Sequence, residues 1–204
     1  MFNLLKQQLA QFPVFTTRDI KKIIPNFDRR RLFEWQNKGY IQKIRRGYYR
    51  FTDQSLTEKT LFVIANQVYS PSYISLESAL SYYGFIPEGV HTITSISSRK
   101  TFSFESPVAN FSYRSLKAEL MFGYEMSGEG KKKIALATPE KSVLDYLYLH
   151  HELESIDGVV SLRINPAVFL DEIDQDRWQQ YLGGFGSEAL KKRANNLLTY
   201  LKGN

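Results

Sequence analysis

The spacing of apolar residues changes twice along the chain. From about residue 92 to residue 137 apolar side chains occupy every second position, whereas before and after this region they recur at three- and four-residue spacing. Gly, Pro and Ser separate the alternating segments, which are Phe102 and Phe104, Phe111 and Tyr113, Phe122 to Met126, and Ile134 and Leu136. This order is typical of a mostly antiparallel sheet flanked by helices. We therefore predict an α+β fold.

Start and stop signals predict the helices of residues 55–204, which we call the body. Hydroxyl residues begin helices over 55–69, over 75–83 and from 138, where Thr138-Pro139-Glu140 combines a cap, a first-turn proline and an acid. Helical spacing predicts two more helices over 169–182 and 187–202, the latter with Lys191, Lys192 and Arg193 on a solvated face. The alternation of Val160, Leu162 and Ile164 predicts a strand.

Length and composition limit the class of protein. The 204 residues suffice for one large domain or two modest ones, and 43% hydrophobic residues allow sizeable cores. No window approaches 18 uncharged apolar residues, and the first residues lack the pattern of a secretory signal. Cysteine is absent, which excludes disulfides and thiolate metal sites. We therefore expect a cytoplasmic protein with no membrane partner.

The excess of positive charge is confined to one end of the chain. Residues 1–58 hold 12 Lys and Arg against 5 Asp and Glu, whereas the remaining 146 residues hold 15 against 16. A local excess of this kind is an electrostatic footprint for a polyanion, because each neutralised phosphate releases condensed counterions. The charge therefore indicates that the first part of the chain, residues 1–54, binds nucleic acid. We call this part the head.

Two helices joined by a tight turn are predicted in the head. Thr16-Thr17-Arg18-Asp19 offers a hydroxyl cap and an acidic first turn, and the helix ends before Pro25-Asn26. Asp28 can cap a second helix that carries Arg29-Arg30-Arg31 in its first turn and ends at Gly39. In a helix-turn-helix the first residues of the second helix meet base edges in the major groove.

A basic β-hairpin follows this second helix. Residues 40–51 are rich in β-branched and aromatic side chains and are interrupted by Arg46-Gly47, which predicts a hairpin with Arg45 and Arg46 at its tip. A hairpin in this place is the wing of a winged helix, and its arginines would contact phosphates or the minor groove. We therefore predict two domains, a winged helix-turn-helix over 1–54 and an α+β domain over 55–204.

The predicted DNA-binding residues have two roles. A run such as Arg29–Arg31 is by itself usually a solvated helix face, but here it agrees with a capped helix before it and a basic hairpin after it. Arginines of the second helix are expected to select bases, whereas the other cations set affinity and salt dependence. The predicted set is Thr17, Arg18, Lys21, Lys22, Arg29, Arg30, Arg31, Asn37, Lys43, Arg45, Arg46 and Arg50.

The segments that could be catalytic or metal-binding motifs do not match the residue patterns of those motifs, so we expect neither an enzyme nor a cofactor. Gly128-Glu129-Gly130-Lys131-Lys132 lacks the first glycine and the Ser/Thr of a phosphate loop and is better explained as a hairpin turn. His150 and His151 are adjacent on a helix and cannot share one ligand face. The acidic residues between Asp171 and Asp176 do not have the spacing of an EF-hand.

Several segments in this order resemble the AbiEi family of winged-helix antitoxins and regulators. The quoted residues are Arg45-Arg46-Gly47-Tyr48-Tyr49-Arg50 in the wing, the segment from Tyr73 to Glu88, the strand Ile93–Arg99, the helix start Ala137–Asp145 and, more faintly, Leu162–Asn165. The resemblance covers about residues 14–165. It implies an antitoxin of a type IV toxin–antitoxin system, linked to abortive infection, whose head represses its own operon.

The resemblance also implies a functional partner for the body. That partner is a nucleotidyltransferase-like toxin, counteracted without a stable complex being required. Arg99, Lys141 and Asp145 are the polar residues of the matching segments that we expect on such a surface. Two alternatives remain open: a winged-helix repressor whose body senses a ligand or dimerises, and a nuclease or nucleotidyltransferase aimed by its head.

Overall fold

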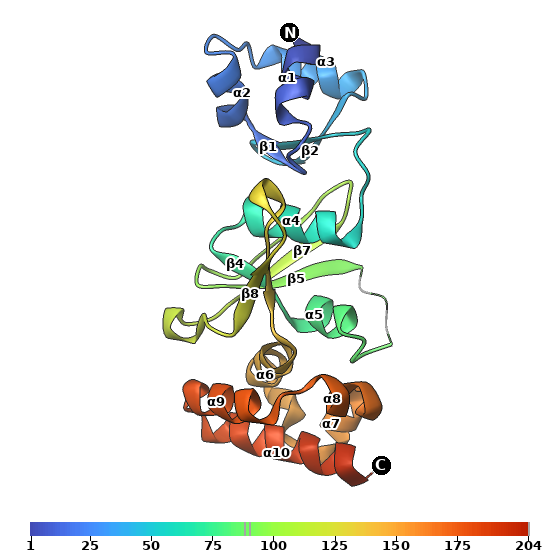
Figure 1. Cartoon of the computed structure of the whole chain (residues 1–204), viewed down its shortest axis with the longest axis vertical. Helices are drawn as coiled ribbons and strands as arrows, with labels where there is room; N and C mark the ends of the chain where they lie inside the picture. The colour runs from blue at the N-terminus through green and yellow to red at the C-terminus, as the bar shows by residue number, and fades with distance from the viewer. Residues whose placement is uncertain (88, 90, 204) are drawn as a thin grey trace.

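The computed structural model describes residues 1–87, 89 and 91–203. The molecule is elongated and consists of three parts stacked along its long axis (Figure 1). The head lies at one end, a β-sheet lies in the middle, and a group of helices from the second half of the body lies at the other end. The fold is therefore α+β, as the change in apolar spacing predicts.

The head combines three helices with a small antiparallel sheet. Its elements are α1 (Phe2–Leu9), β1 (Phe15–Thr16), α2 (Thr17–Ile23), α3 (Arg30–Asn37), β2 (Ile41–Arg45) and β3 (Tyr48–Phe51). The three strands lie in the order β1-β3-β2, and β2 and β3 form the predicted hairpin. Helix α1 was not among the sequence predictions, although Leu5 and Leu9 provide one apolar contact per turn and are buried.

An aromatic core holds the head together. Phe27 and Trp35 lie with ring centroids 5.5 Å apart, and Phe15 and Phe51 lie 4.7 Å apart. Buried aromatic pairs of this kind add to the stabilisation from burial alone. The buried apolar residues of this core all belong to the head; they are Leu5, Leu9, Phe15, Ile20, Phe27, Leu32, Trp35, Ile41, Tyr49 and Phe51.

The body contains a mixed six-stranded sheet. Its strands are β4 (Ser72–Ile74), β5 (Thr92–Ser97), β6 (Phe102–Glu105), β7 (Asn110–Ser115), β8 (Tyr124–Ser127) and β9 (Ile134–Ala137), in the order β6-β7-β5-β4-β9-β8. Three neighbouring pairs are antiparallel, as predicted, whereas β4–β9 and β5–β7 are parallel. The central strand β4 escaped prediction because three residues are too few to display an alternation.

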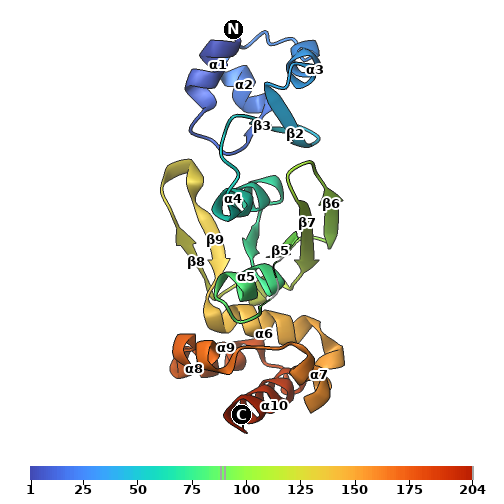
Figure 2. The same cartoon turned by 90° about the vertical axis from the view of Figure 1, so that its right-hand side faces the viewer.

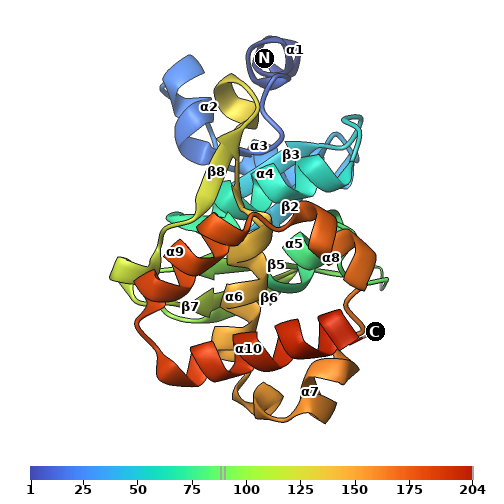
Figure 3. The same ribbon diagram turned by 60° about the horizontal axis from the view of Figure 1, so that its bottom comes forward.

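Helices cover both faces of this sheet. Helix α4 (Glu58–Val68) lies on the face toward the head, and α5 (Leu76–Tyr82) and α6 (Pro139–Leu149) lie on the opposite face (Figure 1). Three further helices, α8 (Pro166–Glu172), α9 (Gln175–Phe185) and α10 (Glu188–Gly203), pack beyond α6 together with the short α7 (Ile156–Ser161) (Figure 3). The 3₁₀ turns over Ala118–Leu120, Gly130–Lys132 and His151–Glu154 complete the chain.

Two predictions for the last part of the chain are wrong. The alternation of Val160, Leu162 and Ile164 does not form a strand, because α7 ends at Ser161 and Arg163 adopts a left-handed φ of 51°. The helix predicted over 169–182 is divided in two, because the Asp174 side chain accepts the Asp176 and Arg177 N–H groups and caps a new helix there.

The head and the body are joined by shared apolar packing. Val14 and Ile44 of the head are buried in the core of the body, and Tyr48 packs against the same core. A β-bulge between Lys43 and Arg45 interrupts the hairpin register beside Ile44, and bulges re-aim side chains in this way. The hairpin therefore lies between the head helices and the body, on the side of β6 and β7 (Figure 2).

The described helices include none that is both long and apolar enough to cross a bilayer.

Replacing Ile44 tests this junction. We expect Ile44→Ala to lower the free energy of unfolding by about 2–5 kcal/mol, because it leaves a cavity between the hairpin and the body. Lys43→Ala is the matched control, since Lys43 is the exposed neighbour on the same strand and should change stability by no more than about 0.5 kcal/mol. Urea unfolding measures both, and equal stability of the two variants would contradict the described junction.

Candidate nucleic-acid interface

Helix α3 presents its charged face to solvent because its apolar face is anchored in the head. Leu32 and Trp35 are buried, at 4% and 6% exposure. The Asp28 carboxylate accepts the Arg30 N–H at 2.9 Å and holds the start of the helix, and Gly39 ends it with a φ of 68°. Asp28 was predicted as the cap itself, whereas the helix begins one residue later, with Arg29 at the cap position.

All three arginines at the start of α3 are exposed. The Arg30 side chain is 91% exposed and lies 3.5 Å from the Asp28 carboxylate, with no contact to the core. An exposed ion pair of this kind contributes little to stability. These guanidinium groups therefore remain available to an external anion or base.

The exposed face of α3 also carries a residue that sequence reasoning missed. Phe33 is 68% exposed and lies on the same face as Arg30 and Asn37, one turn apart along the helix. An apolar side chain in the major groove can contact the methyl group of thymine. The signal was present in the sequence, because Leu32 and Trp35 already occupy the core-facing positions.

Helix α2 adds further cations beside its capped start. Thr16 and Asp19 form a capping box, in which the Thr16 side chain accepts the Asp19 N–H and the Asp19 carboxylate accepts the Thr16 N–H at 2.9 Å. Arg18, Lys21 and Lys22 are exposed, and Thr17 is half-buried at the first helical position.

The hairpin supplies fewer free cations than predicted. Lys43 and Arg46 are exposed, and Gly47 forms the turn with a φ of 88°. The Arg45 guanidinium lies over the Phe102 ring of β6, 4.3 Å from its centroid, and is half-buried. Arg45 is therefore engaged by the body through a cation–π contact, and Arg46 is the arginine that projects from the tip.

The prediction that Arg50 contacts phosphate needs correction. Arg50 is only 4% exposed, and its guanidinium donates to the Gln42 side chain at 3.3 Å and to the Gln54 carbonyl at 2.5 Å. The signal that misled the prediction is the charge itself, because a buried arginine and an exposed one look alike in a basic segment. Arg50 ties the end of β3 to the connection that leads into α4.

The three residues predicted for an antitoxin surface, Arg99, Lys141 and Asp145, do not lie together on the surface of the protein. Arg99 is exposed, lies over the Tyr69 ring at 4.3 Å and donates to the Ser70 carbonyl at 3.2 Å. Lys141 and Asp145 have no exposed area at all. The expectation that these three residues meet a partner together is therefore wrong for Lys141 and Asp145, which point into the interior.

Lys141 and Asp145 form the centre of a buried polar network. One carboxylate oxygen of Asp145 accepts a hydrogen bond from Lys141 Nζ, and the other accepts the hydroxyls of Tyr73 and Ser75, each at 2.8 Å. The Lys141 ammonium also lies over the Phe185 ring at 4.4 Å. Burial raises the pKa of Asp145 and lowers the pKa of Lys141, because desolvation disfavours each charge.

This network also explains an unusual start of α5. Ser75 stands at the cap position as predicted, but its hydroxyl donates to Asp145 and does not cap the helix. The Thr94 hydroxyl of the neighbouring strand accepts the Ser78 N–H at 3.0 Å in its place. Leu76, the first residue of the helix, has a left-handed φ of 56°.

Comparison with known proteins gives no family for the chain. It matches no protein-family model and no curated protein.

Within the described residues, no three His, Asp or Glu side chains cluster in a way that could hold a metal ion.

A double-mutant cycle tests the buried pair. We expect Lys141→Met to destabilise the protein by about 3–5 kcal/mol, because it leaves the Asp145 carboxylate buried without its counter-charge. Adding Asp145→Asn should recover most of that loss, since an amide oxygen still accepts the hydroxyls of Tyr73 and Ser75 without a charge. Urea unfolding of the four proteins measures the cycle, and a Lys141→Met variant as stable as the parent would refute this account.

Proposed function

We propose that the head is a winged helix-turn-helix that binds double-stranded DNA. The observation that carries this proposal is the exposed face of α3, where Arg30, Phe33 and Asn37 stand clear of the protein while Leu32 and Trp35 fill the core. Sequence-reading helices use this division between a buried anchor and an exposed face. The order of three helices and a hairpin, with strands β1-β3-β2, supports the same assignment.

The exposed groups divide into those suited to bases and those suited to phosphates. Arg30 can form a bidentate contact with guanine, Asn37 can pair with adenine, and Phe33 can meet thymine. Glu34, also exposed on α3, would repel phosphate but can accept from cytosine. The remaining exposed cations would bind the backbone and set the salt dependence of affinity; they are Arg18, Lys21, Lys22, Arg29, Arg31, Lys43 and Arg46.

For the whole chain we propose a cytoplasmic, non-enzymatic repressor of its own operon that acts as the antitoxin of a type IV toxin–antitoxin system. The support for the antitoxin role is the resemblance of the segments around 73–99 and 137–145 to the AbiEi family. The toxin counteracted would be nucleotidyltransferase-like. The buried charges at Lys141 and Asp145 give these segments a structural role, so a partner would be met by other residues of the body.

A repressor with a ligand-sensing body is the second candidate. A cavity of about 560 Å³ between the sheet and α6 favours it, because a small molecule could occupy this space.

Two arginines distinguish base selection from phosphate binding. We expect Arg30→Ala to reduce discrimination between operator and scrambled DNA by about 1–3 kcal/mol, because it removes a base contact. Arg46→Ala should weaken both DNAs equally and lower the salt slope by about 1, because it removes a phosphate contact. The measurement is a fluorescence titration with a duplex from upstream of the gene, at several salt concentrations.

Lys192→Ala is the control for this titration. Lys192 is an exposed lysine of α10 at the opposite end of the molecule, and its loss should leave both affinities unchanged (Figure 1). If Arg30→Ala and Arg46→Ala bind both DNAs as the parent does, the proposed interface is wrong.

Co-expression tests the antitoxin role separately. We expect the full chain to relieve the growth arrest caused by the product of the adjacent gene. The Arg30→Ala variant, expressed from an independent promoter, should relieve it equally, because DNA reading is not needed for neutralisation. Persistent arrest, or an adjacent gene whose product is harmless, would favour the ligand-sensing repressor.

A further inference from the structure

A groove with a volume of about 890 Å³ lies between the head and the body. Its head wall is formed by α2, β1 and β3, and its body wall by the end of α4 and by β4, β8 and β9. The turn between β8 and β9 reaches from the body toward the head (Figure 1). Sites for small molecules have volumes of about 300–1,000 Å³, so the groove is large enough for such a ligand.

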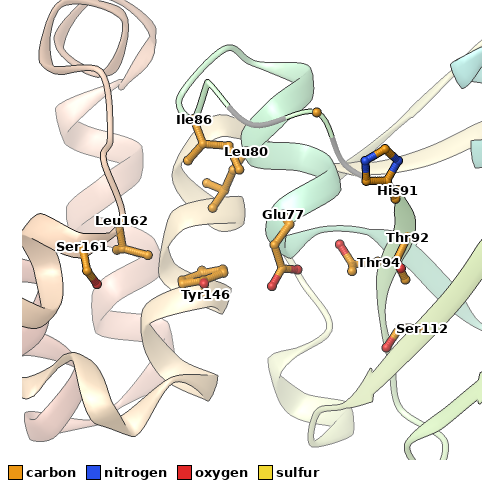
Figure 4. A pocket seen from close by; sticks show the side chains of 11 residues that line it. Glu77, Leu80, Ile86, His91, Thr92, Thr94, Ser112, Tyr146, Ser161 and Leu162 are labelled. Carbon is orange, nitrogen blue, oxygen red and sulfur yellow. The ribbon is translucent and has the colours of Figure 1, made fainter.

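Positive charge enters this groove from both walls. Arg18 and Lys22 come from α2, Lys131 and Lys133 come from the β8–β9 turn, and Asp19 is the one carboxylate among the described lining residues. All four cations are exposed, and within the described part of the chain their one ion pair is that of Lys22 with Asp19. The cavity of about 560 Å³ beside α6 has no lysine or arginine among its described lining residues (Figure 4). The groove, and not that cavity, therefore attracts an anion.

Cations of the two walls meet at Asp19. Lys22 Nζ lies 3.8 Å from one oxygen of this carboxylate. Burial raises the pKa of Asp19, but hydrogen bonds from Thr16 and the charges of Lys22 and Lys131 lower it below its usual value. The Lys131 ammonium also lies over the Phe12 ring of the head, 5.6 Å from its centroid. A lysine of the head and a lysine of the body are thus close enough to the same carboxylate for one multivalent anion to contact both.

The turn that carries the body lysines is held in place. Gly128 has a φ of 86°, and a Cβ atom there would lie 2.7 Å from the Lys132 carbonyl oxygen, so the turn requires glycine. The Gln67 side chain of α4 donates to the Lys131 carbonyl at 2.9 Å. Because the backbone of the turn is already ordered, a ligand need not order it on binding.

One aromatic ring of the groove is open for stacking. Tyr124 of the edge strand β8 is 40% exposed, and its ring is stacked on buried Tyr73 with centroids 4.8 Å apart and planes at 11°. Met126, two residues further along the strand, is 59% exposed. The other aromatic residues that line the groove, Phe12 and Tyr48, are half-buried. One open ring suits one base, whereas proteins bind single strands by stacking successive bases on several rings.

We propose that this groove binds a free nucleoside polyphosphate, with its base on Tyr124 and its phosphates among the four cations. Lysine and arginine form charge-assisted hydrogen bonds with phosphate oxygens, and exposed Met126 extends the apolar surface beside the base. Binding of the nucleotide does not require DNA binding by the head. One consequence does rest on that proposed function: Arg18 and Lys22 also belong to the proposed DNA interface, so the nucleotide would compete with DNA for them.

ATP, adenosine and inorganic tripolyphosphate separate the two halves of such a ligand. Isothermal titration of the full chain without divalent cations should show ATP binding about tenfold or more tightly than either fragment, because only ATP both stacks and pairs its charge. Lys22→Gln, Lys131→Gln and Tyr124→Ala should each weaken ATP about fivefold or more, and the two lysine variants should leave adenosine unchanged. Lys192→Gln, which removes an exposed lysine of α10, is the control and should bind ATP as the parent does.

Three outcomes would overturn the proposal. They are no ATP binding at about 10 mM, equal ATP binding by the parent and the three groove variants, and a Tyr124-dependent single-stranded oligonucleotide that binds about tenfold more tightly than ATP.

Duplex DNA separates this proposal from that for the head. At constant ionic strength, saturating ATP should weaken operator binding about fivefold or more, and Lys131→Gln should reduce this effect. ATP binding without any binding of duplex DNA would refute the function proposed for the head alone, whereas DNA binding without ATP binding would refute the nucleotide site alone.

Discussion

The hydrogen bonds that converge on Asp145 connect three elements of the body. This carboxylate joins α6, which carries Lys141 and Asp145 themselves, to strand β4 through Tyr73 and to the start of α5 through Ser75. Leu76, the residue after Ser75, has a left-handed φ of 56°, which costs a non-glycine residue about 1–2 kcal/mol. The network and its surrounding packing maintain that strained turn. The turn sets the direction of α5, and with it the position of Glu77 one residue later.

Side chains of the β2–β3 hairpin pack into two hydrophobic cores, that of the head and that of the body. Ile41, Tyr49 and Phe51 face the head, whereas Ile44 and Tyr48 face the body. The end of the hairpin is also restrained by the cation–π contact between Arg45 and Phe102. DNA bound to α3 would therefore fix the orientation of the whole chain, and a change of packing at β6 would reach the hairpin directly.

Local signals in the sequence predicted the elements whose physics is local. The helix starts at Thr16 and Thr138 are confirmed because a hydroxyl cap acts within one turn. The helix predicted from Ser55 exists, but its cap is Thr57, two residues later. Burial of charge could not be predicted in this way. Arg193 was expected on a solvated face, but it is 3% exposed and donates to the Leu147 carbonyl, which lies 46 positions away in the chain. The burial of Lys141 and Asp145 was not predicted for the same reason, since Tyr73 and Ser75, the partners of Asp145, are brought near only by the fold.

The proposed DNA-binding face of the head and the cavity of about 560 Å³ in the body differ in the sign of their charge, and this difference determines whether their ligands would compete. Exposed cations of α2, α3 and the hairpin attract a polyanion, whereas the described residues that line the cavity in the body include Glu77 and no lysine or arginine. A ligand of the cavity would therefore not compete with DNA for the head, and DNA would not enter the cavity. One contact path between them runs through β5 and β7, which line the cavity, to the neighbouring β6, where Phe102 meets Arg45 of the hairpin. Coupling by this route requires two packing arrangements of the hairpin against β6, because a ligand can shift an equilibrium only between states to which it binds with different affinity.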